Sequence, residues 1–345
     1  MKTKNKFWFY PFILMGTFLM LTISCKKDKS NTNPTNGWSA LGGKQDLNGV
    51  CDLYVDKNGN LYAVGAFTNI NGNHYVAKWD GSKWSEVGTL NINDCVLAIC
   101  GDLNGNLYIG GAFTDINNNY YVLKWDGSSW TNIGFWGGSG QILKLCADAS
   151  GNVFAGSDIH VTKWDGSNWA VMNMSGYDHW VNALFIDASG NLYVGGGSFT
   201  GGTNGTVAQW NGNGWSVLGD LNAYEQAYTL CKDASGNLYA GGGFDFQSGY
   251  VVKWDGSNWT DLGLSGKDKV RSICIDGKGN LYAGGSFYNS NNKFYVAKWD
   301  GSSWSDMGLD AYCGINKLEY SNNKLYVGGD LTLVLNRGHY IAVYQ

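Results

Sequence analysis

Residues 94–134 read DCVLAICGDLNGNLYIGGAFTDINNNYYVLKWDGSSWTNIG, and this stretch contains four short β-like runs separated by turn signals. An apolar run at 96–100 is followed by the turn DLNGN and by a second run at 107–111. A longer polar loop leads into a third run at 120–125, and an Asp-Gly turn leads into a fourth at 129–134. No part of the stretch has the 3.6-residue period of a helix. The stretch therefore predicts a unit of four antiparallel strands.

The same unit recurs along the chain, most clearly as segments of the GNLYxGG type. The Leu or Val of this segment occurs seven times, at positions 61, 107, 153, 192, 238, 281 and 325. A four-stranded repeat of about 40–50 residues is typical of a β-propeller blade. We therefore predict an all-β fold, a single seven-bladed β-propeller of four-stranded antiparallel blades over residues 38–345.

The two ends of the repeat region predict how the ring closes. The segment NGWSALGG (36–43) matches only the fourth strand of a unit, and HYIAVYQ (339–345) matches only the third strand. The last unit thus lacks the strand that the N-terminus has in excess. We expect the N-terminal strand, at about 37–42, to pair in the last blade and leave no broken blade edge.

The repeat resembles that of kelch-like bacterial β-propeller proteins. The resemblance rests on GNLYAGG (279–285) followed by VAKWDGSSW (296–304), in which a Gly-Gly ends the second strand and an aromatic-Asp-Gly turn precedes a Trp. It covers residues 38–345 and implies a propeller. The two aromatic residues are five positions apart here, which is closer than in kelch repeats. A sialidase Asp-box is also similar, but it has one residue between its Asp and Gly. No function is therefore carried over.

Each KWDGSSW-type segment places two tryptophans around an Asp-Gly turn, as with Trp125 and Trp130. Asp-Gly between two strands indicates a hairpin with a two-residue or a four-residue loop, and both registers leave the two rings on one face of the sheet. Because blades stack face to face, we expect the rings to fill the gap to the neighbouring blade. The alternative is a ring of exposed tryptophans that binds sugar rings.

An acidic residue opens the hairpin between the first and second strands in six of the units. These residues are Asp56, Asp102, Asp148, Asp187, Asp233 and Asp276. Each copy lacks the further alternating carboxylates that a Ca²⁺ site needs. We expect an Asx-turn that caps the hairpin, and no bound metal.

Most of the cysteines follow the repeat. Seven residues before the Leu or Val of each GNLY-type segment stand Tyr54, Cys100, Cys146, Phe185, Cys231, Cys274 and Leu318. Interchange of Cys with aromatic residues and Leu predicts a buried apolar slot in the first strand. Three other cysteines lie near strand starts, where one pairing among them is possible: Cys51, Cys95 and Cys313.

The composition narrows the classes of function. The formal net charge is −4 and no run of Lys or Arg occurs beyond the N-terminus, so a nucleic-acid surface is not expected. The chain has four His, three Glu and two Arg, which is a small stock for acid–base chemistry. We expect no cofactor, and a binding protein rather than an enzyme.

Residues 1–24 have the pattern of a signal peptide. Lys2, Lys4 and Lys6 precede an apolar stretch at 7–24, which ends at Ser24-Cys25. A small residue before Cys is similar to a bacterial lipobox, which implies cleavage before Cys25 and lipidation of that residue. Plain secretion and a retained membrane anchor are the alternatives. The polar segment 25–37 is expected to be a flexible tether.

The segment SCKKDK (24–29) resembles the start of Bacteroidota lipoproteins. Lys26 stands where an Asp favours retention in the inner membrane of other bacteria. The resemblance therefore implies an outer-membrane lipoprotein of the cell envelope, in either the periplasmic or the surface leaflet.

The longer loops are the candidate site. In a propeller, the loops between the second and third strands share one face with the loops that join neighbouring blades. Here these loops are long and varied, and function concentrates on such loops. The alternative is that their side chains pack over the channel mouth. The candidate ligand-binding residues of this long-loop face are Trp136, Tyr177, His179, Tyr224, Glu225, Tyr312 and Arg337.

Three classes of function remain open. The leading hypothesis is a monomeric binding or scaffolding module, anchored to the membrane by its lipid, for a glycan, peptide or protein. The second is a carbohydrate-active hydrolase or lyase at the channel mouth, in which two acid–base groups act across one pocket. The third is a structural ring without a small ligand. The candidates for the acid and base are Asp178, His179, Asp220 and Glu225.

Overall fold

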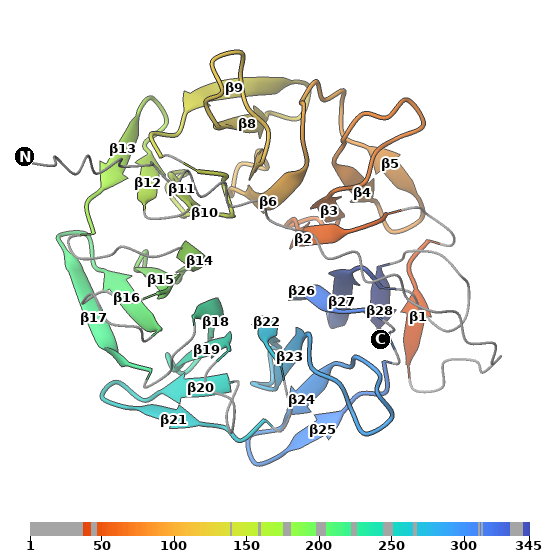
Figure 1. The fold of residues 1–345 in the computed structure, drawn as a ribbon, viewed down its shortest axis with the longest axis vertical. Coiled ribbons are helices and arrows are strands. Elements are labelled where there is room, and N and C mark those ends of the chain that lie inside the picture. Colours follow the sequence, from red (N-terminus) through yellow and green to blue (C-terminus); the bar gives the residue numbers. More distant parts are fainter. Residues whose placement is uncertain are drawn as a thin grey trace, which may run out of the picture.

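Seven sheets, each of four antiparallel strands, form a closed ring (Figure 1). The structure is a computed structural model that describes residues 37–42, 47–138, 140–157, 160–174, 181–197, 205–221, 226–243, 251–264, 268–309, 311, 313–331 and 341–345. Within these ranges every regular element is a strand, and no helix long and apolar enough to cross a membrane is found. The predicted seven-bladed, all-β propeller is confirmed.

The first strand of each blade borders the centre of the ring, and each of these inner strands contacts the inner strands of both neighbouring blades (Figure 1). The inner strands are β2 (Val50–Val55), β6 (Val96–Gly101), β10 (Lys144–Ala147), β14 (Val181–Ile186), β18 (Ala227–Lys232), β22 (Val270–Ile275) and β26 (Ile315–Ser321). The second strands are β3 (Leu61–Gly65), β7 (Leu107–Gly111), β11 (Val153–Gly156), β15 (Leu192–Gly196), β19 (Leu238–Gly242), β23 (Leu281–Gly285) and β27 (Lys324–Gly329).

The third and fourth strands complete each blade toward the rim. The third strands are β4 (Ala77–Trp79), β8 (Tyr121–Trp125), β12 (Val161–Trp164), β16 (Thr206–Trp210), β20 (Val251–Trp254), β24 (Ala297–Trp299) and β28 (Ala342–Tyr344). The outer strands are β5 (Trp84–Glu86), β9 (Trp130–Phe135), β13 (Trp169–Met172), β17 (Trp215–Asp220), β21 (Trp259–Asp261), β25 (Trp304–Asp306) and β1 (Trp38–Ala40). For residues 94–134, these bounds agree with the predicted runs to within one residue.

The ring closes through the N-terminal strand, as the sequence predicts. Strand β1 pairs antiparallel with β28, with Trp38 opposite Tyr344 and Ala40 opposite Ala342. The Trp38 ring is buried, and its Nε1 donates a hydrogen bond to the carbonyl oxygen of Met307 at 2.8 Å. The last blade thus combines residues from both ends of the chain.

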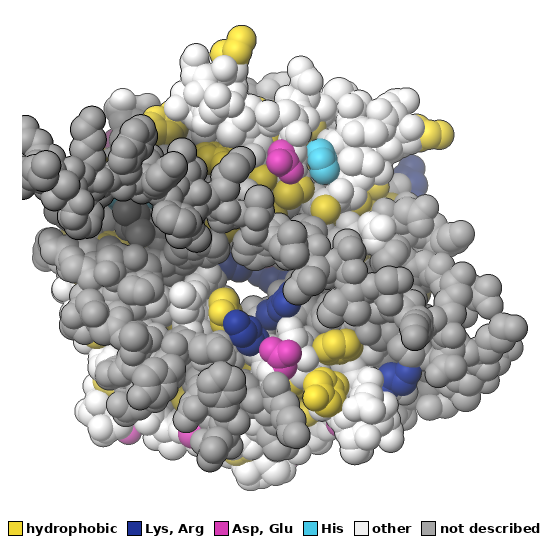
Figure 2. Space-filling model, in the orientation of Figure 1, with side chains coloured by type: hydrophobic (Ala, Val, Ile, Leu, Met, Phe, Trp, Pro, Cys, Tyr) yellow, Lys and Arg dark blue, Asp and Glu magenta, His cyan; other side chains and the backbone are white. Residues whose placement is uncertain are grey.

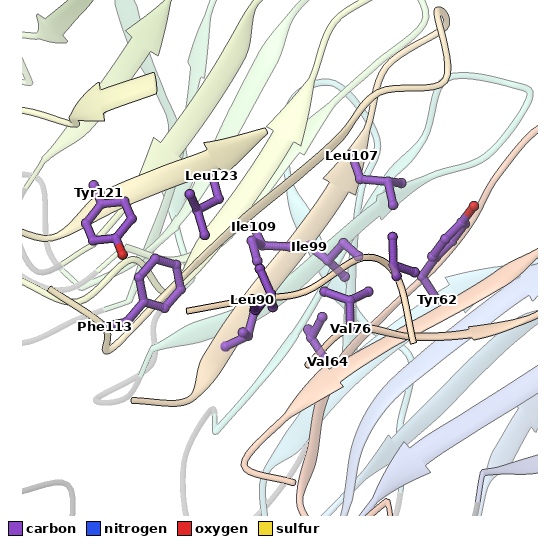
Figure 3. Packing of buried hydrophobic residues seen from close by; sticks show 12 residues of the cluster. Tyr62, Val64, Val76, Leu90, Ile99, Leu107, Ile109, Phe113, Tyr121 and Leu123 are labelled. Carbon is purple, nitrogen blue, oxygen red and sulfur yellow. The ribbon is translucent and has the colours of Figure 1, made fainter. Parts of the chain in front are cut away.

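The hydrophobic core lies between neighbouring blades. In one cluster, Tyr62, Val64 and Val76 of the first blade pack against Ile99 and Ile109 of the second blade (Figure 3). The second strand is buried along its whole length, as in β7, because both faces of each sheet contact another blade. Its continuous apolar sequence follows from this two-sided burial.

The tryptophan pairs join each blade to the preceding one. Trp125 and Trp130 lie directly opposite each other around a four-residue loop, with ring centroids 5.4 Å apart. Trp130 Nε1 donates a hydrogen bond to the carbonyl oxygen of Val87, in the preceding blade, at 2.7 Å. Trp84 and Trp304 donate the equivalent bonds to the carbonyl oxygens of Leu41 and Leu262, each in the preceding blade. The structural interpretation of KWDGSSW is therefore confirmed.

A glycine at the end of the fourth strand makes room for the next tryptophan pair. Gly88 has a φ of 61°, and a Cβ at this residue would lie 2.5 Å from the ring of Trp125. Both the backbone conformation and the close approach of the ring require Gly here. Gly42, which follows β1, has the same role, because a Cβ there would lie 2.5 Å from the ring of Trp79 in the next blade.

The acidic residues of the first hairpin cap Asx-turns. Asp102 Oδ1 accepts hydrogen bonds from the backbone N–H groups of Asn104 and Asn106, each at 2.9 Å. Asp102 Oδ2 accepts from the amide of Asn106 and from the hydroxyl of Tyr108. Among the described residues, no group of three or more His, Cys, Asp or Glu could hold a metal ion. The Asx-turn interpretation is confirmed.

Candidate functional site

Most of the predicted ligand-binding residues lie outside the described parts of the chain: Tyr177, His179, Tyr224, Glu225, Tyr312 and Arg337. Asp178 lies outside them too, as does the side chain of Asp220, the last residue of β17. Trp136 is described, and its side chain is fully buried in a cluster with Val122 and Ile142. A Cβ at Gly138 would overlap its ring. Trp136 therefore packs between the second and third blades, away from solvent.

One position of the inner strand links neighbouring blades, and we call it the linking position. It lies two residues before the slot that is Cys, Tyr or Phe in most blades. It is the third residue of each inner strand except the shorter β10, where it is the first. In three blades its oxygen accepts a hydrogen bond from a backbone N–H of the next inner strand. These bonds join Asp52 to Ile99, Thr229 to Ile273 and Ser272 to Leu318. In two other blades the position is Ala98 or Ala183. A short side chain is thus sufficient at this position.

Two blades have a lysine at the linking position, and Lys317 is the first of them. Its Nζ lies 2.9 Å from Asp52 Oδ1 and 3.9 Å from Glu319 Oε2. Burial alone lowers the pKa of Lys317, but the two carboxylates outweigh burial and raise this pKa above its usual value. Asp52 is in the first blade and Lys317 in the last, so this ion pair spans the closure of the ring.

Glu319 occupies the slot that the sequence assigned to Leu318. Glu319 lies opposite Tyr326, as Tyr54 lies opposite Tyr62 in the first blade. The hairpin of the last blade is one residue shorter, because Asn322 and Asn323 form a tight turn with positive φ at both residues. A count of seven residues back from Leu325 therefore gives Leu318, which is one residue before the slot. Burial raises the pKa of Glu319 to about 7, although Lys317 acts in the opposite direction.

Lys144 is the second lysine at a linking position. It stands at the same position of its inner strand as Asp52 and Lys317 do of theirs, so it lies at the same level of the channel as that ion pair. Burial lowers its pKa, and the attraction of Asp52 offsets only part of this effect. Among the described residues, Lys144 makes no salt bridge and no hydrogen bond through Nζ.

Arg271 precedes a linking position in the sixth blade. Its side chain is exposed, and its Nη1 donates a hydrogen bond to Asn316 Oδ1 at 2.7 Å. Asn316 is held in turn, because its amide donates to the carbonyl oxygen of Val50 at 3.0 Å. In the described parts of the chain, Arg271 has no carboxylate partner. Two residues before Arg271 in the chain, Lys269 places its Nζ 5.5 Å from the centre of the Tyr228 ring.

We call Asp52, Lys144, Arg271, Asn316 and Lys317 the channel mouth. They lie in the first half of their inner strands, which is the half that follows the blade-to-blade loops and so belongs to the long-loop face. Figure 2 shows Lys and Arg side chains gathered around the opening at the centre of the ring. The whole chain has a net charge of −4, so this positive region is a local feature.

Two surface hollows lie elsewhere. One lies between the fourth and fifth blades beside Lys232 and Trp254, and the other beside Met307 and Tyr344 near the closure. Lys232 is already paired with Asp187 at 2.8 Å. The walls of the first hollow include a tryptophan pair member and a hairpin turn that recur in every complete unit. We therefore place the candidate site at the channel mouth, where the repeat is broken.

A signal for the channel mouth is present in the sequence. Lys144 and Lys317 stand where the other units have Asp, Ala, Ser or Thr, and both Arg271 and Glu319 are of residue types that are rare in this chain. That these residues share one channel follows only from the ring, because Asp52 and Lys317 are far apart in the chain.

Comparison with solved structures shows the propeller fold. YCF48, solved bound to a peptide, has a TM-score of 0.61 at 12% identity, over 90% of this chain and 96% of that chain. The WD40 propeller domain of Doa1 has a TM-score of 0.64 at 14% identity, over 90% of this chain and 97% of that chain. Virginiamycin B lyase from Staphylococcus aureus has a TM-score of 0.69 at 8% identity, over 89% of this chain and 98% of that chain. No protein-family model and no curated protein matches the chain.

Proposed function

We propose that the propeller is a binding module that holds a segment of a peptide or protein over its channel mouth. The observation that supports this most is the position of Lys144, Arg271 and Lys317, which break the repeat at the end of the inner strands that faces the long loops. Elsewhere the repeated residues are used for packing between blades. A neighbour of this fold, YCF48, was solved with a bound peptide, which is consistent with this use of a propeller.

Photo-crosslinking tests which face binds. A peptide selected from a displayed random library is mixed with two variants, each carrying a photo-crosslinking amino acid in place of one exposed residue. Asp268 precedes β22 on the long-loop face, and Ser128 is at the tip of a short turn on the opposite face. We expect crosslinks at position 268 and none at position 128. The proposal is wrong if no peptide is selected, or if crosslinking occurs only at position 128.

A second candidate function is a hydrolase or lyase, and Glu319 favours it. A carboxyl group with a pKa of about 7 beside Lys317 has the proton affinity that general acid–base catalysis needs near neutral pH. Virginiamycin B lyase is an enzyme with this fold, but at 8% identity it supports the fold alone. Loss of a measured glycan-cleaving or eliminating activity in Glu319→Gln, with binding retained, would establish the candidate.

We also propose that the chain is a kelch-like lipoprotein of the cell envelope, lipidated at Cys25 and held in the outer membrane. The support is the apolar stretch that ends at Ser24-Cys25 and the polar segment after it. A tether at 25–37 would place the propeller close to the membrane without fixing its orientation.

A further inference from the structure

Two cations of the channel mouth form no salt bridge with a described residue, and Asp52, the carboxylate that attracts Lys144, is already paired with Lys317. Lys317 is neutralised by Asp52 and lies near Glu319, whereas Lys144 and Arg271 form no salt bridge there. A charge that is partly removed from water is costly unless an opposite charge or hydrogen-bond acceptor replaces the lost water. Lys144 is therefore a group that gains from an added anion.

Arg271 has the geometry to take part in the same recognition. Asn316 accepts from one Nη of Arg271 and so orients the guanidinium, while Asn316 is itself fixed to Val50. An oriented guanidinium has further donors, and its planar fork matches the two oxygens of a carboxylate. Because Arg271 is exposed, it is accessible from the long-loop face.

The two cations stand on opposite sides of the ring. Lys144 is in β10 of the third blade and Arg271 is in β22 of the sixth blade, across the channel from it (Figure 1). Separated cations match separate carboxylates along an extended chain better than they match one compact anion. An extended peptide advances about 3.3–3.6 Å per residue, so a few acidic residues could reach both sides.

We propose that the channel mouth recognises an acidic peptide segment, whose carboxylates are bound by Lys144 and Arg271 from opposite sides of the channel. This inference rests on the proposed function and names the chemistry of its ligand. Lys317 contributes to the field but is committed to Asp52, and Asn316 acts as a positioning residue for Arg271.

Fluorescence anisotropy with the whole propeller tests the inference. The probes are labelled octaglutamate, octaglutamine, octalysine and polygalacturonate. We expect octaglutamate alone to bind, with an affinity that falls several-fold between about 50 and 200 mM salt. Lys144→Gln and Arg271→Gln should each weaken binding by about 5–10-fold, and Arg271→Lys should have a smaller effect because it retains the charge and loses the fork.

Lys124→Gln is the matched control. This lysine is in β8, with its ammonium over the ring of Tyr108, and it lies away from the channel. Its substitution should leave octaglutamate binding unchanged. Circular dichroism spectra verify that each variant is folded, and Lys144→Met replaces Lys144→Gln if the latter unfolds.

Three outcomes would overturn the inference. The first is octaglutamate binding that is equally tight in the wild type and in the Lys144 and Arg271 variants. The second is octalysine binding as tight as octaglutamate binding. The third is polygalacturonate binding tighter than octaglutamate binding, which would indicate an acidic glycan as the ligand. If library-selected peptides still crosslink at position 268 in these cases, the proposed peptide-binding function stands without the acidic preference. If no peptide binds at all, both proposals fail.

Discussion

At the residue scale, one small hairpin difference changes the chemistry of the channel. The two positive-φ asparagines at 322–323 shorten the last first-to-second hairpin by one residue, and this moves Glu319 into a slot that is Cys, Tyr or Phe in other blades. A carboxyl group there is partly removed from water beside Lys317. The propeller thus gains one group that titrates near neutral pH.

Glu319 predicts a pH dependence of stability. Its pKa is raised from 4.5 to about 7 in the folded protein, so the folded state binds more protons than the unfolded state between these values. This contribution to the free energy of unfolding is therefore present below pH 4.5 and is lost as the pH rises to about 7. Relative to Glu319→Gln, the wild type should lose about 1–3 kcal/mol over this window in urea denaturation.

Glu86→Gln, at an exposed glutamate of β5, is the control for this effect. The difference in stability between the wild type and Glu319→Gln should change more with pH than the difference between the wild type and Glu86→Gln. Equal pH dependence of the two differences would show that the pKa of Glu319 is not shifted.

Glycines at the strand ends predict a second residue-scale effect. Gly88→Ala and Gly127→Ala both place a side chain at positive φ, with φ of 61° and 100°. Such strain costs about 1–3 kcal/mol. Gly127 has nothing within 4 Å of an added Cβ, whereas Gly88 has the ring of Trp125 at 2.5 Å. Gly88→Ala should therefore lose about 1–3 kcal/mol more in chemical denaturation. Equal losses would contradict the packing role of Gly88.

At the scale of the element, the unit of stability is a pair of adjacent blades. The tryptophan pair, its hydrogen bond to the preceding blade and the intervening cluster all join two sheets, as Trp130 with Val87 illustrates. The closing blade depends on β1 for the same contacts, since β1 supplies Trp38 and covers the edge of β28.

Truncation measures the contribution of β1. Removal of residues 1–42 should lower the melting temperature, because the edge of β28 becomes exposed and the buried Trp38 is lost. The loss of the Trp38 side chain from the core alone should cost about 3–5 kcal/mol of stability. Removal of residues 1–36 stops before β1 and is the matched control, with no expected change. Equal melting temperatures for the two truncations would mean that β1 does not close the ring in solution.

At the scale of the whole molecule, the ring separates packing from recognition. Repeated residues build the interfaces between blades, while unrepeated charges converge at the centre, where four different inner strands contribute to the channel mouth. A closed ring allows this division because every blade borders the central channel and no blade fills it.

Membrane attachment predicts a whole-molecule phenotype. If Cys25 is lipidated, Cys25→Ala should move the protein from the membrane fraction to the soluble fraction, since a thioether-linked lipid is the proposed anchor. Fractionation followed by immunoblotting measures this. Ser24→Ala keeps a small residue before the Cys and should leave the protein in the membrane fraction. Unchanged fractionation of Cys25→Ala would contradict lipidation.

Sequence alone determined the blades, their number and their closure. These depend on local, repeated signals: Asp-Gly hairpins such as that at Asp126, Asx-turns such as that of Asp102, and the split of the last blade between two chain ends. Only the tertiary structure decided the channel mouth. Asp52, Lys144, Arg271 and Lys317 belong to four blades, and nothing in their local sequence states that they border one channel. Their common channel follows from ring closure, and the place of Glu319 follows from a strand register that only pairing can define.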